Sequence, residues 1–156
     1  MKIADPYVAG EPRILGIDIE NGPRWYGPGD YTYPIIFHIA WKWVGTPDED
    51  VQSVCIDWRA SENTLRRLCK GLWEDASSCT SYLGHNFRHD YGGLQGLARD
   101  IGLPFLDKKP VIDTMRDIPK HQGPSKSLED LCKQFELGEK PHLSGRDWID
   151  ALWRWR

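Results

Sequence analysis

The sequence has no long hydrophobic run, and this absence restricts the class of protein. No stretch approaches the roughly 18 consecutive apolar residues that a membrane-spanning helix requires. The first residues, from Met1 to Pro6, also lack the apolar core of a signal peptide. These two absences argue against a membrane protein and predict a soluble protein that remains in the cytoplasm.

Cysteine pairs and an excess of positive charge are missing as well. The four cysteines show no Cys-x-x-Cys spacing, which argues against a zinc knuckle or a disulfide framework and predicts reduced packing residues. The formal net charge is -3 at pH 7, so the chain is not expected to coat nucleic acid through bulk electrostatics. A nucleic-acid enzyme is still compatible with this charge, because divalent cations held by carboxylates reverse the local charge.

The length and composition are those of a globular protein. The chain has 156 residues, of which 40% are hydrophobic and 28% charged, and this size can bury a core without disulfides or a structural metal. It shows no internal repeat, low-complexity tract or domain linker. We therefore expect a single domain over residues 1–156, with residues 1–12 as an N-terminal arm.

The stretch from Arg13 to Glu20 predicts a buried strand, because it is short, rich in isoleucine and followed by a turn sequence. Side chains alternate between the faces of a strand, so Asp18 and Glu20 are predicted to lie on the same face, roughly 7 Å apart. Two carboxylates at that separation can share a cation. The alternative is that both simply lie at a solvated strand end.

The remaining elements follow from periodicity and turn residues. Ile35 to Val44 alternates between a face of large apolar residues, including Phe37, and a mixed face, and this pattern predicts a strand that packs on the core. Three consecutive strands joined by turns suggest an antiparallel meander. The expected strands are 13–20, 35–44, 51–58, 81–86 and 111–114. One helix is expected to begin after Ser61, and three others are expected at 90–101, 128–135 and 147–155. A loop is expected at 121–126.

Two polar clusters lie beyond the first strand. His85 and Asn86 precede Asp90, and His142 precedes Asp147. Each cluster places a carboxylate near the start of a predicted helix, where the exposed backbone donors and the helix dipole favour an ionised acid. Taken alone, each aspartate is more often a helix cap than a metal ligand.

In chain order, these pieces resemble the DEDDh family of 3'-to-5' exonucleases, the DnaQ-like branch of the ribonuclease H-like superfamily. The family motifs are Asp-x-Glu on the first strand, a His-Asn pair followed closely by Asp, and His-x-Ala-x-x-Asp. The related DEDDy branch has a tyrosine where this chain has Leu143, so the resemblance is to DEDDh. The matching residues are Asp18, Glu20, His85, Asn86, Asp90, His142 and Asp147.

The chain departs from the family pattern at three places. Asn21-Gly22 replaces the usual threonine after Asp-x-Glu, His89 replaces an aromatic residue before the second-motif aspartate, and Ser144 replaces alanine. The first two departures affect predicted substrate contacts and not the predicted metal ligands. The predicted substrate-binding residues are Asn21, Gly22, Trp25, Tyr26 and Asn86.

The resemblance implies an α/β, ribonuclease H-like fold: a central mixed five-stranded sheet, made of an antiparallel meander of strands 1–3 plus two parallel strands, flanked by helices. It implies two divalent metal ions, Mg²⁺ or Mn²⁺. Asp18 would bridge both, Glu20 and Asp147 would complete one site, Asp90 would support the other, and His142 would act as general base. These five residues form the predicted catalytic set.

The implied substrates are 3' ends of single-stranded DNA or RNA, with a polymerase or replication protein as a candidate partner and no membrane. Two other interpretations stay open at this point. One is RNA 3' trimming by an oligoribonuclease-like enzyme, since neither the fold nor the ligands separate DNA from RNA. The other is a non-catalytic nucleic-acid-binding subunit of the proofreading type.

Overall fold

A computed structural model describes residues 11–21, 35–122 and 127–136. The chain divides into two compact units, residues 1–114 and 115–156. The expectation of one domain over residues 1–156 stays a prediction. None of the helices in the described ranges combines the length and hydrophobicity that crossing a bilayer demands.

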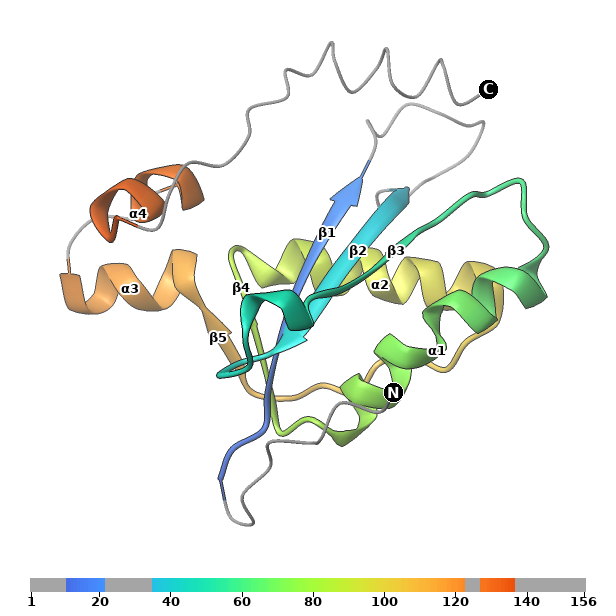
Figure 1. The fold of residues 1–156 in the computed structure, drawn as a ribbon, viewed down its shortest axis with the longest axis horizontal. Coiled ribbons are helices and arrows are strands. Elements are labelled where there is room, and N and C mark those ends of the chain that lie inside the picture. The colour runs from blue at the N-terminus through green and yellow to red at the C-terminus, as the bar shows by residue number, and fades with distance from the viewer. Residues whose placement is uncertain (1–10, 22–34, 123–126, 137–156) are drawn as a thin grey trace, which may run out of the picture. The chain divides into compact units, whose positions relative to one another are not determined.

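The first unit is built on a mixed five-stranded sheet (Figure 1). Its strand order is β3-β2-β1-β4-β5. β1 pairs antiparallel with β2, and β2 antiparallel with β3, whereas β1 pairs parallel with β4, and β4 with β5. The predicted meander with two added parallel strands is therefore confirmed. The strands are β1 Ile14–Asn21, β2 Ile36–Trp43, β3 Gln52–Cys55, β4 Ser81–Gly84 and β5 Val111–Asp113.

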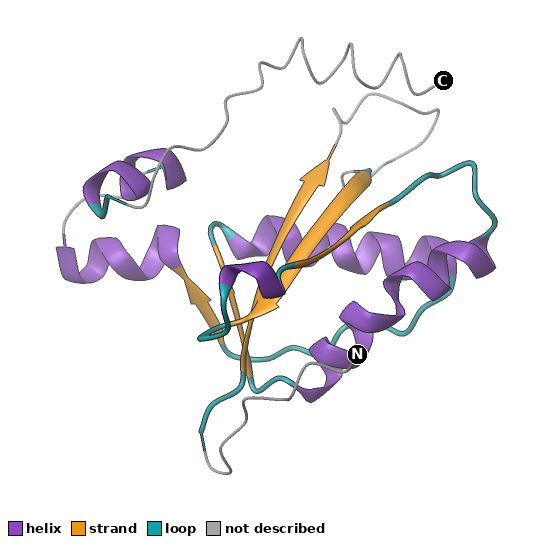
Figure 2. Ribbon diagram, viewed as in Figure 1, coloured by secondary structure: helices purple, strands orange, loops and turns teal. Residues whose placement is uncertain are grey.

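Two helices form the crossovers of the sheet: α1, Glu62–Ser78, connects β3 to β4, and α2, Phe87–Ile101, connects β4 to β5. Both crossovers move along the sheet in the same direction, and right-handed connections of this kind place their helices on the same face (Figure 2). Their apolar residues join the buried face of the sheet in one hydrophobic cluster. The acidic residues of β1 are left on the opposite face. A short 3-10 helix, Asp48–Asp50, precedes β3.

Burial along β1 follows the alternation that its sequence predicts. Ile17 and Ile19 are buried, and Asp18 between them is exposed. A register irregularity between Glu20 and Asn21 interrupts the pairing with β2. Beyond this bulge, Ile36 is buried and Phe37 is only half-buried, so the predicted core position of Phe37 is wrong. A bulge inserts one extra residue, and this exchanges the two faces locally.

Two helix predictions needed correction. α2 begins at Phe87, before the expected start at Asp90, and α3, Thr114–Gln122, was not predicted at all. The last two residues of α3 fall within 121–126, where the sequence predicts a loop. The sequence of this short segment is a weak signal for a helix because it contains Pro119, and proline lacks the backbone donor of a helix interior. The final predicted helix, 147–155, lies outside the described residues.

In the second unit, the helix expected at 128–135 is present as α4, Leu128–Gln134, and Ser127 caps it. The Ser127 hydroxyl accepts a hydrogen bond from the Asp130 backbone N–H at 3.1 Å. This bond satisfies one of the donors that the first turn of a helix leaves without a partner. The helix buries Leu131.

The cysteines are free, and they differ in environment. Cys69 and Cys79 are buried packing residues, as predicted, and Cys132 is half-buried. Cys55 is exposed on β3, so its predicted packing role is wrong. β3 lies at an edge of the sheet, and an edge strand leaves more of its side chains in water.

The carboxyl end of α1 depends on a lysine from another segment. The last turn of α1 contains no basic residue, and Lys109 Nζ donates to the carbonyl oxygens of Ala76, Ser77 and Cys79 at 2.6, 2.9 and 2.6 Å. Lys109→Met should lower the free energy of unfolding by about 2 kcal/mol, because charged hydrogen bonds to helix carbonyls are lost. Urea unfolding measures this loss. The exposed neighbour Lys108 is the control, and an equal effect of Lys108→Met would contradict the assignment.

Candidate active site

The acidic pair of β1 lies on the sheet face opposite α1 and α2. The pairing between β1 and β2 is regular from Leu15 to Glu20, so Asp18 and Glu20, two residues apart, lie on one face, as predicted. Asp18 stands opposite Ala40, and Glu20 stands opposite His38. A small neighbour beside Asp18 leaves its carboxylate accessible from solvent.

A third carboxylate reaches this part of β1 from α2. Asp90 Oδ1 accepts a hydrogen bond from the backbone N–H of Ile19 at 3.1 Å. Ile19 lies beyond Gly16, the last β1 residue that pairs with β4. The Asp90 carboxylate therefore accepts a backbone N–H of β1 beyond the point where pairing with β4 ends. The sequence predicts Asp18, Glu20 and Asp90 as one set, and the fold places Asp90 on the residue between the other two.

The environment of Asp90 opposes its ionisation. Asp90 is 5% exposed, and its pKa is raised to about 7. Burial is the main cause, and the negative charges of Asp18 and Asp113 add to it, whereas the hydrogen bond from Ile19 lowers the pKa. Within the described part of the chain, neither Lys nor Arg pairs with Asp90. Buried carboxylates with a raised pKa and acidic neighbours are frequent at functional sites, where a cation offsets their repulsion.

Asp113, at the end of β5, was not predicted as a site residue, and it shapes the start of α2. Its two carboxylate oxygens accept from the backbone N–H groups of Asn86 at 2.9 Å and Phe87 at 3.1 Å. Asn86 itself has a left-handed backbone, with φ 59°. Its side chain is exposed and makes no capping hydrogen bond, and its role in substrate binding stays a prediction. The one sequence signal for Asp113 is its place at the end of a strand.

His85 follows β4 and bonds to a side chain. The Thr114 hydroxyl donates to Gly84 O at 3.3 Å and lies 3.0 Å from His85 Nδ1. Because the hydroxyl proton is used, His85 Nδ1 carries the proton of this bond and Nε2 is left as an acceptor. A histidine that closes a strand is expected to pack and to bond to the backbone. The partner is instead the Thr114 side chain.

The two departures from the family pattern at Asn21 and His89 contact each other. His89 Nε2 lies 3.3 Å from Asn21 Oδ1, and an amide oxygen is an acceptor, so the proton of this bond is on Nε2. Asn21 is predicted to bind substrate, and in this structure its amide oxygen is engaged by His89. Asparagine in place of threonine and histidine in place of an aromatic residue thus form one polar contact beside the acids.

Asn21→Thr and His89→Phe should each lower the stability of the protein, and the double variant should lose less than the sum of the two. A partly buried hydrogen bond between neutral groups contributes about 1 kcal/mol, and this sets the expected coupling energy. Urea unfolding of the four proteins measures it. Strictly additive losses would show that the two residues act independently.

The other predicted site residues, Gly22, Trp25, Tyr26, His142 and Asp147, lie outside the described residues. Within the described ranges, no three His, Cys, Asp or Glu side chains converge closely enough to hold a metal ion unaided. The predicted ligands within the described ranges, Asp18 and Glu20 on β1 and Asp90 bonded to Ile19 between them, are all carboxylates, and such oxygen ligands suit Mg²⁺ or Mn²⁺ better than zinc. The donor chemistry therefore fits the implied metals.

Comparison with known proteins identifies the fold. No protein-family model and no curated protein matches the chain. Solved structures do match, among them the family B DNA polymerase from the hyperthermophilic archaeon Pyrobaculum calidifontis, with a TM-score of 0.63 and 16% sequence identity. The match covers 86% of this chain and 20% of the polymerase chain, so this chain spans about a fifth of that protein. At this identity the likeness concerns the fold, which is α/β and ribonuclease H-like.

Proposed function

We propose that this protein is a metal-dependent 3'-to-5' exonuclease that removes nucleotides from the ends of single-stranded nucleic acid. The observation that carries this proposal is the hydrogen bond between Asp90 and Ile19. It brings a buried acid from α2 to the strand that bears Asp18 and Glu20, in the motif order of the DEDDh family. The ribonuclease H-like fold supports the same assignment.

The residues have distinct parts in this proposal. Asp18, Glu20, Asp90 and Asp147 would hold two divalent ions, Mg²⁺ or Mn²⁺, which when bound supply positive charge to the scissile phosphate and lower the pKa of the attacking water. Burial of Asp90 keeps its carboxylate fixed and away from solvent. The exposed side chain of Asn86 lies at the start of the same helix and would contact the terminal nucleotide, together with Gly22, Trp25 and Tyr26.

His142 is the proposed general base. Imidazole with an ordinary pKa near ~6.5 accepts the proton of an attacking water at neutral pH. His85 is the competing candidate, because it too precedes a predicted metal ligand by five residues and its Nε2 is an available acceptor. The Thr114 hydroxyl, however, holds the His85 ring at the end of β4, which favours a structural role.

The test of this proposal uses the pure protein with Mn²⁺ and 5'-labelled single-stranded DNA and RNA of equal sequence. A ladder of shortened products that retain the label is the expected result, and it reports activity, polarity and sugar preference together. Products from RNA alone would favour the oligoribonuclease-like alternative. Binding of both strands without any cleavage would favour the non-catalytic subunit and overturn the proposal.

His142→Ala should lower turnover by about 10²-fold or more, the usual range for loss of a general base. Metal binding should be retained, and a higher pH, which supplies hydroxide, should partly restore the rate. His85→Ala should cost less turnover and more thermal stability, because it breaks the contact with Thr114. Initial rates from the same ladder assay, together with melting curves, check both variants. A greater loss of turnover in His85→Ala than in His142→Ala would show that the third motif was assigned wrongly.

A further inference from the structure

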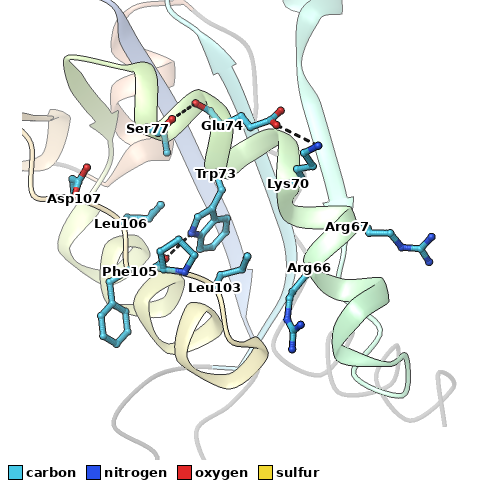
Figure 3. Close-up of a pocket in the computed structure, with 12 residues that line it drawn as sticks. Arg66, Arg67, Lys70, Trp73, Glu74, Ser77, Leu103, Phe105, Leu106 and Asp107 are labelled. Carbon is cyan, nitrogen blue, oxygen red and sulfur yellow. Dashed lines mark hydrogen bonds and ion pairs between the residues drawn. The ribbon is translucent and has the colours of Figure 1, made fainter.

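A groove of about 600 Å³ lies between α1 and the segment 102–107 that follows α2 (Figure 3). Its floor is apolar. The indole of Trp73 lies at the centre, flanked by Leu103 and Leu106. Trp73 Nε1 donates to the carbonyl oxygen of Pro104 at 2.8 Å. This hydrogen bond satisfies the polar atom of the indole and fixes the ring, so the Trp73 ring contributes apolar surface to the floor.

The groove is separate from the candidate active site. Asp90 lies in the first turn of α2, and Ile101 ends that helix. At 1.5 Å per residue, the 11 steps between them span roughly 16 Å. The segment that lines the groove follows the far end of α2, and Asp18, Glu20 and Asp90, the predicted catalytic residues that the structure describes, do not line it.

Two exposed side chains at the rim of the groove are available to contact a bound molecule. Phe105 is 64% exposed and extends from the segment 102–107. On α1, Arg66 bonds to Glu62 and Lys70 pairs with Glu74, whereas Arg67 is exposed and makes no ion pair within the described part of the chain. The groove therefore offers an exposed aromatic ring, an apolar floor and one guanidinium that is available to an acid.

The charge balance favours a protein partner over a nucleic-acid strand. Three cationic side chains line the groove, and two acidic ones, Glu74 and Asp107, line it with them, which leaves a net charge of +1. A strand with a phosphate at every residue needs a more positive track and would meet both carboxylates. A peptide segment needs one apolar anchor and one complementary charge, and this groove supplies both.

We infer that this groove binds a segment of another protein that carries a bulky apolar side chain beside an acidic residue. The apolar side chain packs between Trp73 and Phe105, and the acid pairs with Arg67. This inference does not depend on the exonuclease activity, since the groove shares no residue with the part of the candidate active site that the structure describes.

The probe for this inference is a fluorescein-labelled peptide, Gly-Asp-Asp-Leu-Phe-Asp-Gly, and binding is followed by fluorescence anisotropy. We expect binding with a Kd below about 1 mM. Replacing Leu-Phe by Ala-Ala in the peptide, or its Asp residues by Lys, should weaken binding at least about tenfold. In NMR spectra, the indole N–H signal of Trp73, assigned with Trp73→Phe, should shift on addition of the peptide.

Protein variants locate the contact. Phe105→Ala and Arg67→Glu should each weaken binding at least about tenfold, because both residues are exposed and can be changed without loss of the fold. Val51→Ala and Arg59→Glu, exposed residues outside the groove, are the controls and should bind as the parent does. All four variants should retain the nuclease rate of the parent protein, so a negative nuclease assay leaves this test intact.

Three results would overturn the inference. One is no binding of the acidic peptide up to about 1 mM. The second is undiminished binding to Arg67→Glu and Phe105→Ala. The third is binding of a single-stranded thymidine oligonucleotide that shifts the Trp73 signal and that is weaker in Arg67→Glu. This result would assign the groove to nucleic acid.

Discussion

Replacing Asp18 with alanine is expected to abolish hydrolysis, lowering turnover at saturating Mn²⁺ by at least about 10³-fold, while the chain stays folded. A bound metal supplies several kcal/mol of transition-state stabilisation, and each 1.4 kcal/mol is about a tenfold change in rate. Asp18 is exposed on the open face of β1, so no core packing is lost with it. The ladder assay gives the rate, and circular dichroism confirms the fold.

The matched control is Asp57→Ala, which removes a partly exposed aspartate that pairs with Arg59 outside the site. This variant should keep the parent rate. In metal-free buffer, Asp18→Ala should also melt at a higher temperature than the parent, because the charge of Asp18 adds to the difficulty of ionising Asp90. Cleavage that persists in Asp18→Ala, or in excess chelator, would rule out the proposed metal site.

The sheet and the acidic pair were predictable because their signals are local. Alternation of side chains places Asp18 and Glu20 on one face whatever the rest of the chain does. Turn residues separate the strands of the meander, and the cap at Ser61 fixes the start of α1. The order of the three motifs then predicted the parallel strands through the family resemblance, and not through any pattern in those short strands.

The features that escaped prediction depend on residues far apart in the chain. α2 begins at Phe87 because Asp113, from β5, accepts the backbone N–H of Phe87. The residues near Phe87 contain no signal that predicts this distant partner. The contact between Asn21 and His89 joins residues 68 positions apart. Both positions were recognised as departures from a family pattern, but only the folded chain shows that they compensate each other.

The same dependence on distant residues creates the main cost of the site. Asp90 is buried next to β1, and that position raises its pKa from 3.8 to about 7. At about 1.36 kcal/mol per pKa unit, this shift corresponds to roughly 4 kcal/mol. A protein of this size has a total stability of about 5–15 kcal/mol. The free-energy cost of ionising Asp90 in the folded protein is therefore a large fraction of the total stability.

The sign of the pH dependence follows from which state holds the proton. Between pH ~4 and ~7, folded Asp90 keeps a proton that the unfolded chain has released. The folded state binds more protons, so stability from this group is present below pH ~4 and falls as the pH rises through ~7. A bound divalent ion favours the ionised carboxylate, and so metal should return much of the stability lost at high pH.

Asp90→Asn should remove this dependence and raise the metal-free stability at pH 8 by up to about 4 kcal/mol, since the neutral amide can still accept from Ile19 N–H. Urea unfolding at pH 5 and pH 8 with chelator measures the difference between parent and variant. The variant should also lose stabilisation by Mn²⁺ and nearly all nuclease activity. Asp100→Asn, an exposed aspartate on the same helix, is the control and should leave the pH profile of the parent unchanged. If the parent and Asp90→Asn lose equal stability between pH 5 and pH 8, Asp90 is not the buried acid that links folding to metal binding.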